Sequence, residues 1–131
     1  MSNYRTNAGA VFSLKYHIVW CPKYRKNVLV DPVDKRLKEL LYYQTKKYNM
    51  EIHSLEIMPD HVHVFIEADV TMCVAEITNR LKGYTSKMLR DEFKFLRTRL
   101  PTLWSRSYYA GTVGHVSEAT IKKYIENQKG K

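Results

Sequence analysis

The fold is decided by residues 51–68, which read EIHSLEIMPDHVHVFIEA. Apolar and polar residues alternate over Glu51–Met58 and again over His61–Ala68, which predicts two β-strands. Pro59 and Asp60 lie between them and are typical of a tight turn. We therefore expect an antiparallel hairpin. The face of its second strand that we expect in the core carries Val62, Val64, Ile66 and Ala68.

Two histidines begin the second strand of this hairpin. His61 and His63 are two residues apart, so their side chains lie on the same strand face, about 7 Å apart. Two imidazoles at that spacing can share one divalent metal ion. They can equally be two solvent-facing strand residues with an accidental spacing, and the spacing alone leaves both interpretations open.

The elements around the hairpin are predicted from the spacing of apolar residues and from residues typical of helix ends. Val11–Trp20 alternates and predicts a strand with one core face. Asp31 and Pro32 indicate an N-cap and a first helical turn, and apolar residues at helical spacing extend that helix to about Tyr48. Similar spacing predicts a second helix over Val74–Met88, with Gly83 near its middle.

The remaining chain adds one strand and one helix. Trp104–Val113 is expected to form a fourth strand, and Ser117 to cap a last helix over about residues 117–129. The resulting order predicts an α+β fold, a ferredoxin-like or RRM-like β-α-β-β-α-β sandwich with a central antiparallel sheet and an appended C-terminal helix. With 131 residues and no long linker, the chain is expected to form one domain over residues 1–131.

The charge distribution favours a polyanionic partner. The chain has a formal net charge of +9, and Met1–Val30 contains no acidic residue. Ten tyrosines and two tryptophans lie among the cations, as stacking on unpaired bases requires, although core packing and a solvated surface use the same residues. The candidate contacts to such a polyanion are Lys23, Arg25, Lys26, Lys82, Lys87, Arg106, Lys122 and Lys123.

Cysteine content and hydropathy indicate the compartment. The two cysteines, Cys21 and Cys73, form no CxxC motif, so neither a disulfide framework nor a zinc knuckle is indicated. No apolar run reaches membrane-spanning length, and the N-terminus has no signal-peptide core. We expect a cytoplasmic protein without a membrane partner.

The last helix carries a second pair of polar residues. Tyr124 and Gln128 are four apart, so they lie one helical turn apart on a shared face. Lys122 and Lys123 flank the tyrosine, and we expect their charge to favour the phenolate and to attract phosphate. Most helical tyrosines are packing residues, and that interpretation also remains open at this point.

Several motifs together resemble one family. They are KYRK at 23–26, MPDHVH at 58–63, LKGYTSK at 81–87, WSRSYY at 104–109 and YIENQ at 124–128. In this order they resemble the small single-tyrosine HUH transposases of insertion sequences, of the IS-two-hundred type, in which HUH stands for histidine, hydrophobe, histidine. The resemblance extends over nearly the whole chain.

The resemblance implies roles for four residues. His61 and His63 match the metal-ligand pair, Gln128 the side chain that completes the metal site, and Tyr124 the nucleophile. The implied metal is Mg²⁺ or Mn²⁺. Zinc is disfavoured because no thiolate or third histidine is obviously placed. No ATP is expected, since no phosphate-binding GxxxxGK[ST] loop is present.

The resemblance also implies an activity and an assembly. The family cleaves and rejoins single-stranded DNA with hairpin ends through a 5′-phosphotyrosine, as a homodimer whose composite sites share the tyrosine helix. Gly111 and Gly114 are then candidate hinges, or an ordinary turn. The alternatives are a related HUH nickase or domesticated repeat-associated transposase, a metal phosphodiesterase using water, and a noncatalytic RRM-like RNA-binding protein.

Overall fold

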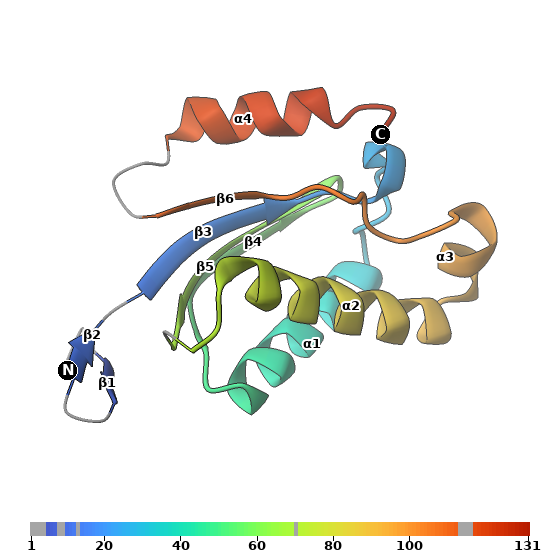
Figure 1. Ribbon diagram of the computed structural model, residues 1–131. Helices are drawn as coiled ribbons and strands as arrows, with labels where there is room; N and C mark the ends of the chain where they lie inside the picture. The colour runs from blue at the N-terminus through green and yellow to red at the C-terminus, as the bar shows by residue number, and fades with distance from the viewer. Residues whose placement is uncertain (1–4, 8–9, 13, 70, 113–116) are drawn as a thin grey trace.

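A four-stranded antiparallel sheet forms the centre of the molecule (Figure 1). The computed structural model describes residues 5–7, 10–12, 14–69, 71–112 and 117–131. In the order in which they lie in the sheet, the strands are β4 (Glu51–Met58), β5 (His61–Ala68), β3 (Leu14–Trp20) and β6 (Tyr109–Thr112). This order is that of a ferredoxin-like fold, so the α+β class predicted from the sequence is confirmed.

Helices lie on both faces of the sheet. Helices α1 (Val33–Lys47) and α2 (Val74–Glu92) cover one face, and α4 (Glu118–Asn127) lies across the other (Figure 1). A short α3 (Lys94–Arg99) and a 3₁₀ turn η1 (Lys23–Arg25) complete the helical elements of the described residues. None of the helices described is long and apolar enough to cross a membrane.

Two strands differ in their bounds from those expected. The first strand begins at Leu14, because Ala10–Phe12 (β2) pairs with Arg5–Asn7 (β1) in a separate two-stranded sheet. The fourth strand is shorter than expected, since Trp104 forms an isolated bridge with Pro22 and regular pairing starts at Tyr109. Alternation predicts that residues are extended, but it does not identify the strand with which they pair.

The helix boundaries follow the local chemistry. Helix α1 begins at Val33 without a side-chain cap, and the Asp31 carboxylate instead forms an ion pair with Lys35 at 2.9 Å. Helix α2 continues past Gly83, around which there is open space, so the glycine does not interrupt it. Ser117 caps α4 as expected, because its hydroxyl accepts a hydrogen bond from the Thr120 backbone N–H.

A β-bulge breaks the alternation of β4 once. Ile52 pairs with Ile66 and Ser54 with Phe65, which leaves His53 as the additional residue. Because side chains alternate with a period of two, this extra residue allows Ile52 and Leu55 to face the same side of the sheet. Both pack against the core, although they are three residues apart.

The core lies between the sheet and helices α1 and α2. The expected inner face of β5 is confirmed, since Val62, Val64, Ile66 and Ala68 are all 0% exposed. These side chains pack in one cluster with Leu37 and Leu41 of α1 and Ile77 and Leu81 of α2. The opposite face of β5, which carries the histidines, is thereby held on a rigid support.

Truncating this core is expected to destabilise the fold. Ile66→Ala should lower the free energy of unfolding by about 2–4 kcal/mol, because the side chain is fully buried and its loss leaves a cavity. Urea unfolding followed by circular dichroism measures this change. The exposed Lys46→Ala is the control, expected within about 0.5 kcal/mol of the parent. Equal effects of the two substitutions would contradict the assigned core.

Candidate active site

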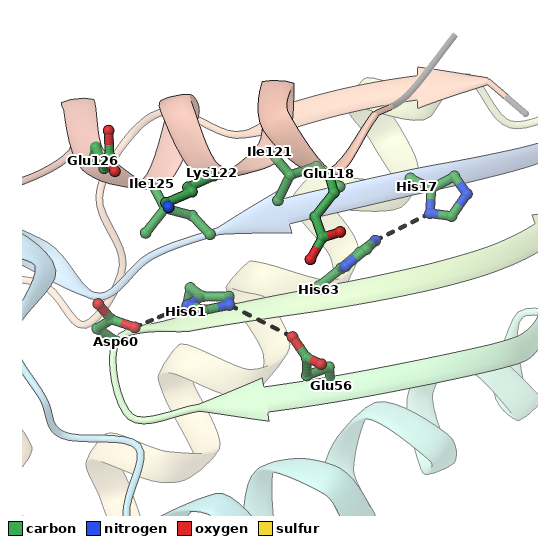
Figure 2. Close-up of a pocket in the computed structure, with 10 residues that line it drawn as sticks. All are labelled: His17, Glu56, Asp60, His61, His63, Glu118, Ile121, Lys122, Ile125 and Glu126. Carbon is green, nitrogen blue, oxygen red and sulfur yellow. Dashed lines mark hydrogen bonds and ion pairs between the residues drawn. The ribbon is translucent and has the colours of Figure 1, made fainter. Parts of the chain in front are cut away.

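A pocket lies between the outer face of the sheet and helix α4 (Figure 2). His61 and His63 extend from β5 toward it, and Ile121 and Ile125 of α4 face it from the other side. Its volume is about 610 Å³. The residues that line it are His17, Glu56, Asp60, His61, His63, Glu118, Ile121, Lys122, Ile125 and Glu126.

Carboxylates approach both ring nitrogens of His61. Its Nδ1 lies 2.8 Å from Asp60 Oδ1, and its Nε2 lies 3.8 Å from Glu56 Oε1 (Figure 2). A carboxylate on one nitrogen fixes the ring orientation and raises the basicity of the other nitrogen. The turn residue Asp60 therefore orients His61.

A third histidine accompanies the pair. His17 Nδ1 lies 3.0 Å from His63 Nε2, and the His17 ring stacks on Phe65 with centroids 4.4 Å apart. The sequence did not obviously place a third histidine, and the structure brings His17 to the pair. Alternation places His17 on the outer face of its strand, but only the pairing of β3 with β5 brings it to His63.

Burial favours the neutral form of His17 and His63. It lowers the pKa of His17, and it lowers the pKa of His63, to which the proximity of His17 adds a smaller effect in the same direction. A metal ion binds the neutral form of imidazole. The pocket thus offers the imidazoles of His61 and His63 from β5 and the carboxylate of Glu118 from α4, a donor set that fits a divalent cation.

Tyr124 faces away from this pocket. Its hydroxyl lies 2.9 Å from Ser107 Oγ, and its ring lies 6.1 Å from that of Tyr109 on β6. Burial raises the pKa of Tyr124 to about 12, against the opposing effect of the Ser107 hydrogen bond. The expectation that neighbouring lysines favour the phenolate is therefore wrong for this arrangement. Desolvation is the largest cause of the shift, and Lys122 lines the histidine pocket.

Gln128 lies beside Tyr124, as their four-residue spacing predicts. It is 7% exposed, and its Oε1 accepts hydrogen bonds from Ser107 Oγ at 2.8 Å and Ser105 Oγ at 3.3 Å. Because Ser107 donates its proton to Gln128, it must accept from the Tyr124 hydroxyl. Within one chain, the structure groups Tyr124 and Gln128 with two serines and not with His61 and His63.

Arg25 contacts both the tyrosine-bearing helix α4 and the Asp60 carboxylate beside the histidines. Its Nη1 donates to the Ile125 carbonyl oxygen at 3.2 Å, and its Nε lies 3.5 Å from Asp60 Oδ2. The Asp60 carboxylate in turn contacts His61. Arg25 therefore docks the tyrosine helix and supports the residue that orients a histidine, roles that its positive charge alone did not reveal.

Lys82 supports the serines that hold Tyr124 and Gln128. Its Nζ donates to the carbonyl oxygens of Ser105 and Ser107, at 2.7 and 3.1 Å, and burial lowers its pKa to about 8. Trp104 Nε1 donates to the Lys82 carbonyl oxygen at 3.1 Å. Lys82 therefore fastens this segment to α2, so it is not a freely exposed cation.

The other candidate DNA contacts lie in different surroundings. Lys87 forms an ion pair with Asp91 at 3.5 Å, and the Lys23 Nζ lies 5.1 Å from the centre of the Tyr24 ring. The exposed members of the set are Lys26, Lys87, Arg106, Lys122 and Lys123. Of the two candidate hinges, Gly111 lies within β6 and Gly114 lies outside the described residues.

Comparisons with known proteins show the family of this chain. The sequence model of the family described as "Transposase IS200 like" matches residues 10–128. The ISDra2 transposase TnpA of Deinococcus radiodurans is 36% identical over 94% of this chain and 89% of its own length. The IS200 transposase of Salmonella typhimurium is 32% identical over 98% of this chain and 85% of its own length.

Two solved structures share the fold. A crystal structure of a Deinococcus radiodurans protein described as a transposase has a TM-score of 0.89 and 34% identity, covering 97% of this chain and 99% of that protein. A REP-associated tyrosine transposase bound to a REP hairpin shares the fold, with a TM-score of 0.58 and 12% identity over 96% of this chain and 69% of its own. The chain belongs to the IS200-like transposase family.

Proposed function

We propose that this transposase cleaves and rejoins single-stranded DNA through a covalent bond between Tyr124 and a 5′ phosphate. The observation that carries the proposal is the docking of the tyrosine-bearing helix α4 over the pocket of His61 and His63. A nucleophile, a metal-binding pair and a basic surface are the components that phosphoryl transfer requires.

His61 and His63 are the residues that would hold the divalent metal. Burial of His63 favours its neutral form, and Asp60 orients His61. When bound, Mg²⁺ or Mn²⁺ polarises the scissile phosphate and neutralises the charge that develops on it. Gln128 is proposed to complete this site, which requires it to leave Ser105 and Ser107.

Tyr124 is proposed to supply the attacking oxygen. Its hydroxyl oxygen forms a bond to phosphorus, the bond to the 3′ oxygen breaks, and the phenolic proton is lost while the departing 3′ oxygen gains one. The products are a 5′-phosphotyrosine and a free 3′-OH. One phosphodiester replaces another of similar energy, so rejoining by attack of a 3′-OH needs no ATP.

We infer that the complete site is shared between two subunits. In one chain, α4 presents Ile121 and Ile125 to the histidines, whereas Tyr124 is hydrogen-bonded to Ser107. A homodimer that exchanges the tyrosine helix would bring Tyr124 and Gln128 to the histidine pocket of the other subunit. Mixing an inactive Tyr124→Phe chain with an inactive His63→Ala chain would then restore cleavage.

DNA with hairpin ends is the proposed substrate. The REP-associated transposase with the same fold is described as bound to a REP hairpin, and the IS200 relatives are described as transposases of insertion sequences. The formal net charge of +9 suits a polyanion. We propose that exposed cations around α4, including Lys122, Lys123 and Arg106, contact the phosphates.

The covered sheet disfavours the RNA-binding alternative. An RRM-like module stacks bases on aromatic rings of an open sheet face. Here α4 lies across that face, and Phe65 is in contact with the rings of His17 and His53, with centroids 4.4 and 5.4 Å away. Its ring is therefore already occupied by protein contacts.

An adduct assay tests the proposed function. Single-stranded oligonucleotides from the flanks of the gene are incubated with the protein and Mg²⁺ or Mn²⁺, and denaturing electrophoresis then detects covalent protein–DNA bands. We expect an adduct that depends on the metal. Cleavage without any adduct would favour a water-using phosphodiesterase, and binding without cleavage would favour a noncatalytic protein.

Asp60 is expected to act on metal affinity through His61. Asp60→Asn should raise the Mn²⁺ concentration that gives half-maximal cleavage by about 10–100-fold, because loss of a ligand-orienting carboxylate typically weakens metal binding by that factor. A cleavage titration with Mn²⁺ measures it. Asp91→Asn, on the surface of α2, is the matched control and should leave the titration unchanged. An unchanged midpoint for Asp60→Asn would contradict the orienting role.

A further inference from the structure

We propose that Glu51, His53 and Glu67 form a second site for a divalent cation, at the opposite end of the sheet from His61 and His63. One ligand atom from each of the three residues lies within 4.8 Å of the other two. His53 Nε2 is 2.8 Å from Glu67 Oε1. Glu51 is the register partner of Glu67 on the neighbouring strand, so all three donors are held by the β4–β5 pairing.

The bulge in β4 builds this arrangement. His53 is the additional residue between Ile52 and Ser54, and its ring contacts Phe65 at a centroid distance of 5.4 Å. The bulge thereby holds the His53 imidazole beside the carboxylate of Glu67. Bulges recur beside functional sites because they change the direction of a side chain.

Glu67 is a buried carboxylate whose neighbours leave room for a compensating cation. Its side chain is 7% exposed, and a buried carboxylate is costly unless it is paired. Lys15 is the register partner of Glu67 on β3, but within the part of the chain that the structure describes no lysine or arginine lies within ion-pair distance of Glu67. The hydrogen bond of Glu67 is to His53, through Oε1. A cation held by Glu67 and the exposed Glu51 would supply the compensating charge.

The donor set indicates the class of cation. One imidazole and two carboxylates suit first-row divalent ions such as Mn²⁺ or Zn²⁺, with water at the remaining positions. The site lies four residues along β5 from His63, with Phe65 between them. The cation would join the start of β4 to the end of β5, and it would act on stability and not on the scissile phosphate.

Metal binding by the full chain tests this proposal separately from DNA cleavage. The double variant His61→Ala/His63→Ala removes the other histidine pair, and electron paramagnetic resonance then measures free Mn²⁺ during a titration. We expect one bound Mn²⁺ per chain. At a concentration about 100-fold above Kd, the ion should raise Tm by at least about 5 °C.

Substitutions at exposed ligands identify the site. Glu51→Gln and His53→Ala, each made in the double variant, should weaken Mn²⁺ binding at least tenfold while leaving the circular dichroism spectrum unchanged. Glu39→Gln, an exposed glutamate on α1, is the matched control and should bind normally. Absence of a bound ion in the double variant, or binding that survives both ligand substitutions, would overturn the proposal. Loss of cleavage in the same proteins would not affect it.

Discussion

Tyr124→Phe is expected to eliminate the covalent protein–DNA adduct while leaving DNA binding within about threefold of the parent. The substitution removes one oxygen atom, and that atom is the proposed nucleophile, so no slower route to the same adduct remains. Gel-based adduct detection and binding of a fluorescent single strand measure the two quantities. The fold should persist, since the lost hydrogen bond to Ser107 contributes only about 1 kcal/mol.

Tyr109→Phe provides the matched control. Tyr109 lies on β6, and its ring is 6.1 Å from that of Tyr124, so both tyrosines share one environment. The control should form adduct at the parent rate. An adduct that persists in Tyr124→Phe and disappears in Tyr109→Phe would show that Tyr109, and not Tyr124, is the nucleophile.

His63→Ala and His61→Ala are each expected to reduce the single-turnover cleavage rate by about 100-fold or more. A metal ion that stabilises phosphoryl transfer contributes several kcal/mol to the transition state, and each 1.36 kcal/mol corresponds to about tenfold in rate. DNA affinity should change by less than about threefold, because the phosphate contacts of the basic surface remain. Quenched cleavage assays and salt-dependent binding measure both effects.

An exposed residue on the neighbouring strand serves as the control for the histidines. Ser54→Ala alters β4 outside the pocket and should cleave at the parent rate. If high Mn²⁺ restores cleavage in one histidine variant and not in the other, the two histidines differ in their share of metal binding. Parent-level cleavage in both variants would contradict a metal role for the pair.

The local part of the site could be predicted from the sequence. The spacing of His61 and His63 fixes them to one strand face, and the spacing of Tyr124 and Gln128 fixes them to one helix face. Both relations hold in the structure. They depend only on the periodicity of a strand or a helix over a few residues, which can be read from the spacing in the sequence.

The long-range part of the site could not be predicted. His17 reaches His63 because β3 pairs with β5, and the two histidines are 46 residues apart in the sequence. The direction in which Tyr124 points depends on how α4 docks, to which Arg25 contributes from 100 residues away. The pKa of Tyr124 is raised, whereas the adjacent lysines predicted that it would be lowered. The docking of α4 buries the side chain, and spacing along the helix does not reveal this burial.

The direction of the hydrogen bonds at Ser107 has a further consequence. One hydroxyl proton cannot serve two acceptors, and here it is directed to Gln128 while Tyr124 donates its own. If Tyr124 is ionised in this position, Ser107 can donate to it only by turning away from Gln128, which then keeps the longer bond from Ser105. Loss of the Tyr124 proton and release of the Gln128 carboxamide are therefore coupled through the rotation of one hydroxyl, that of Ser107.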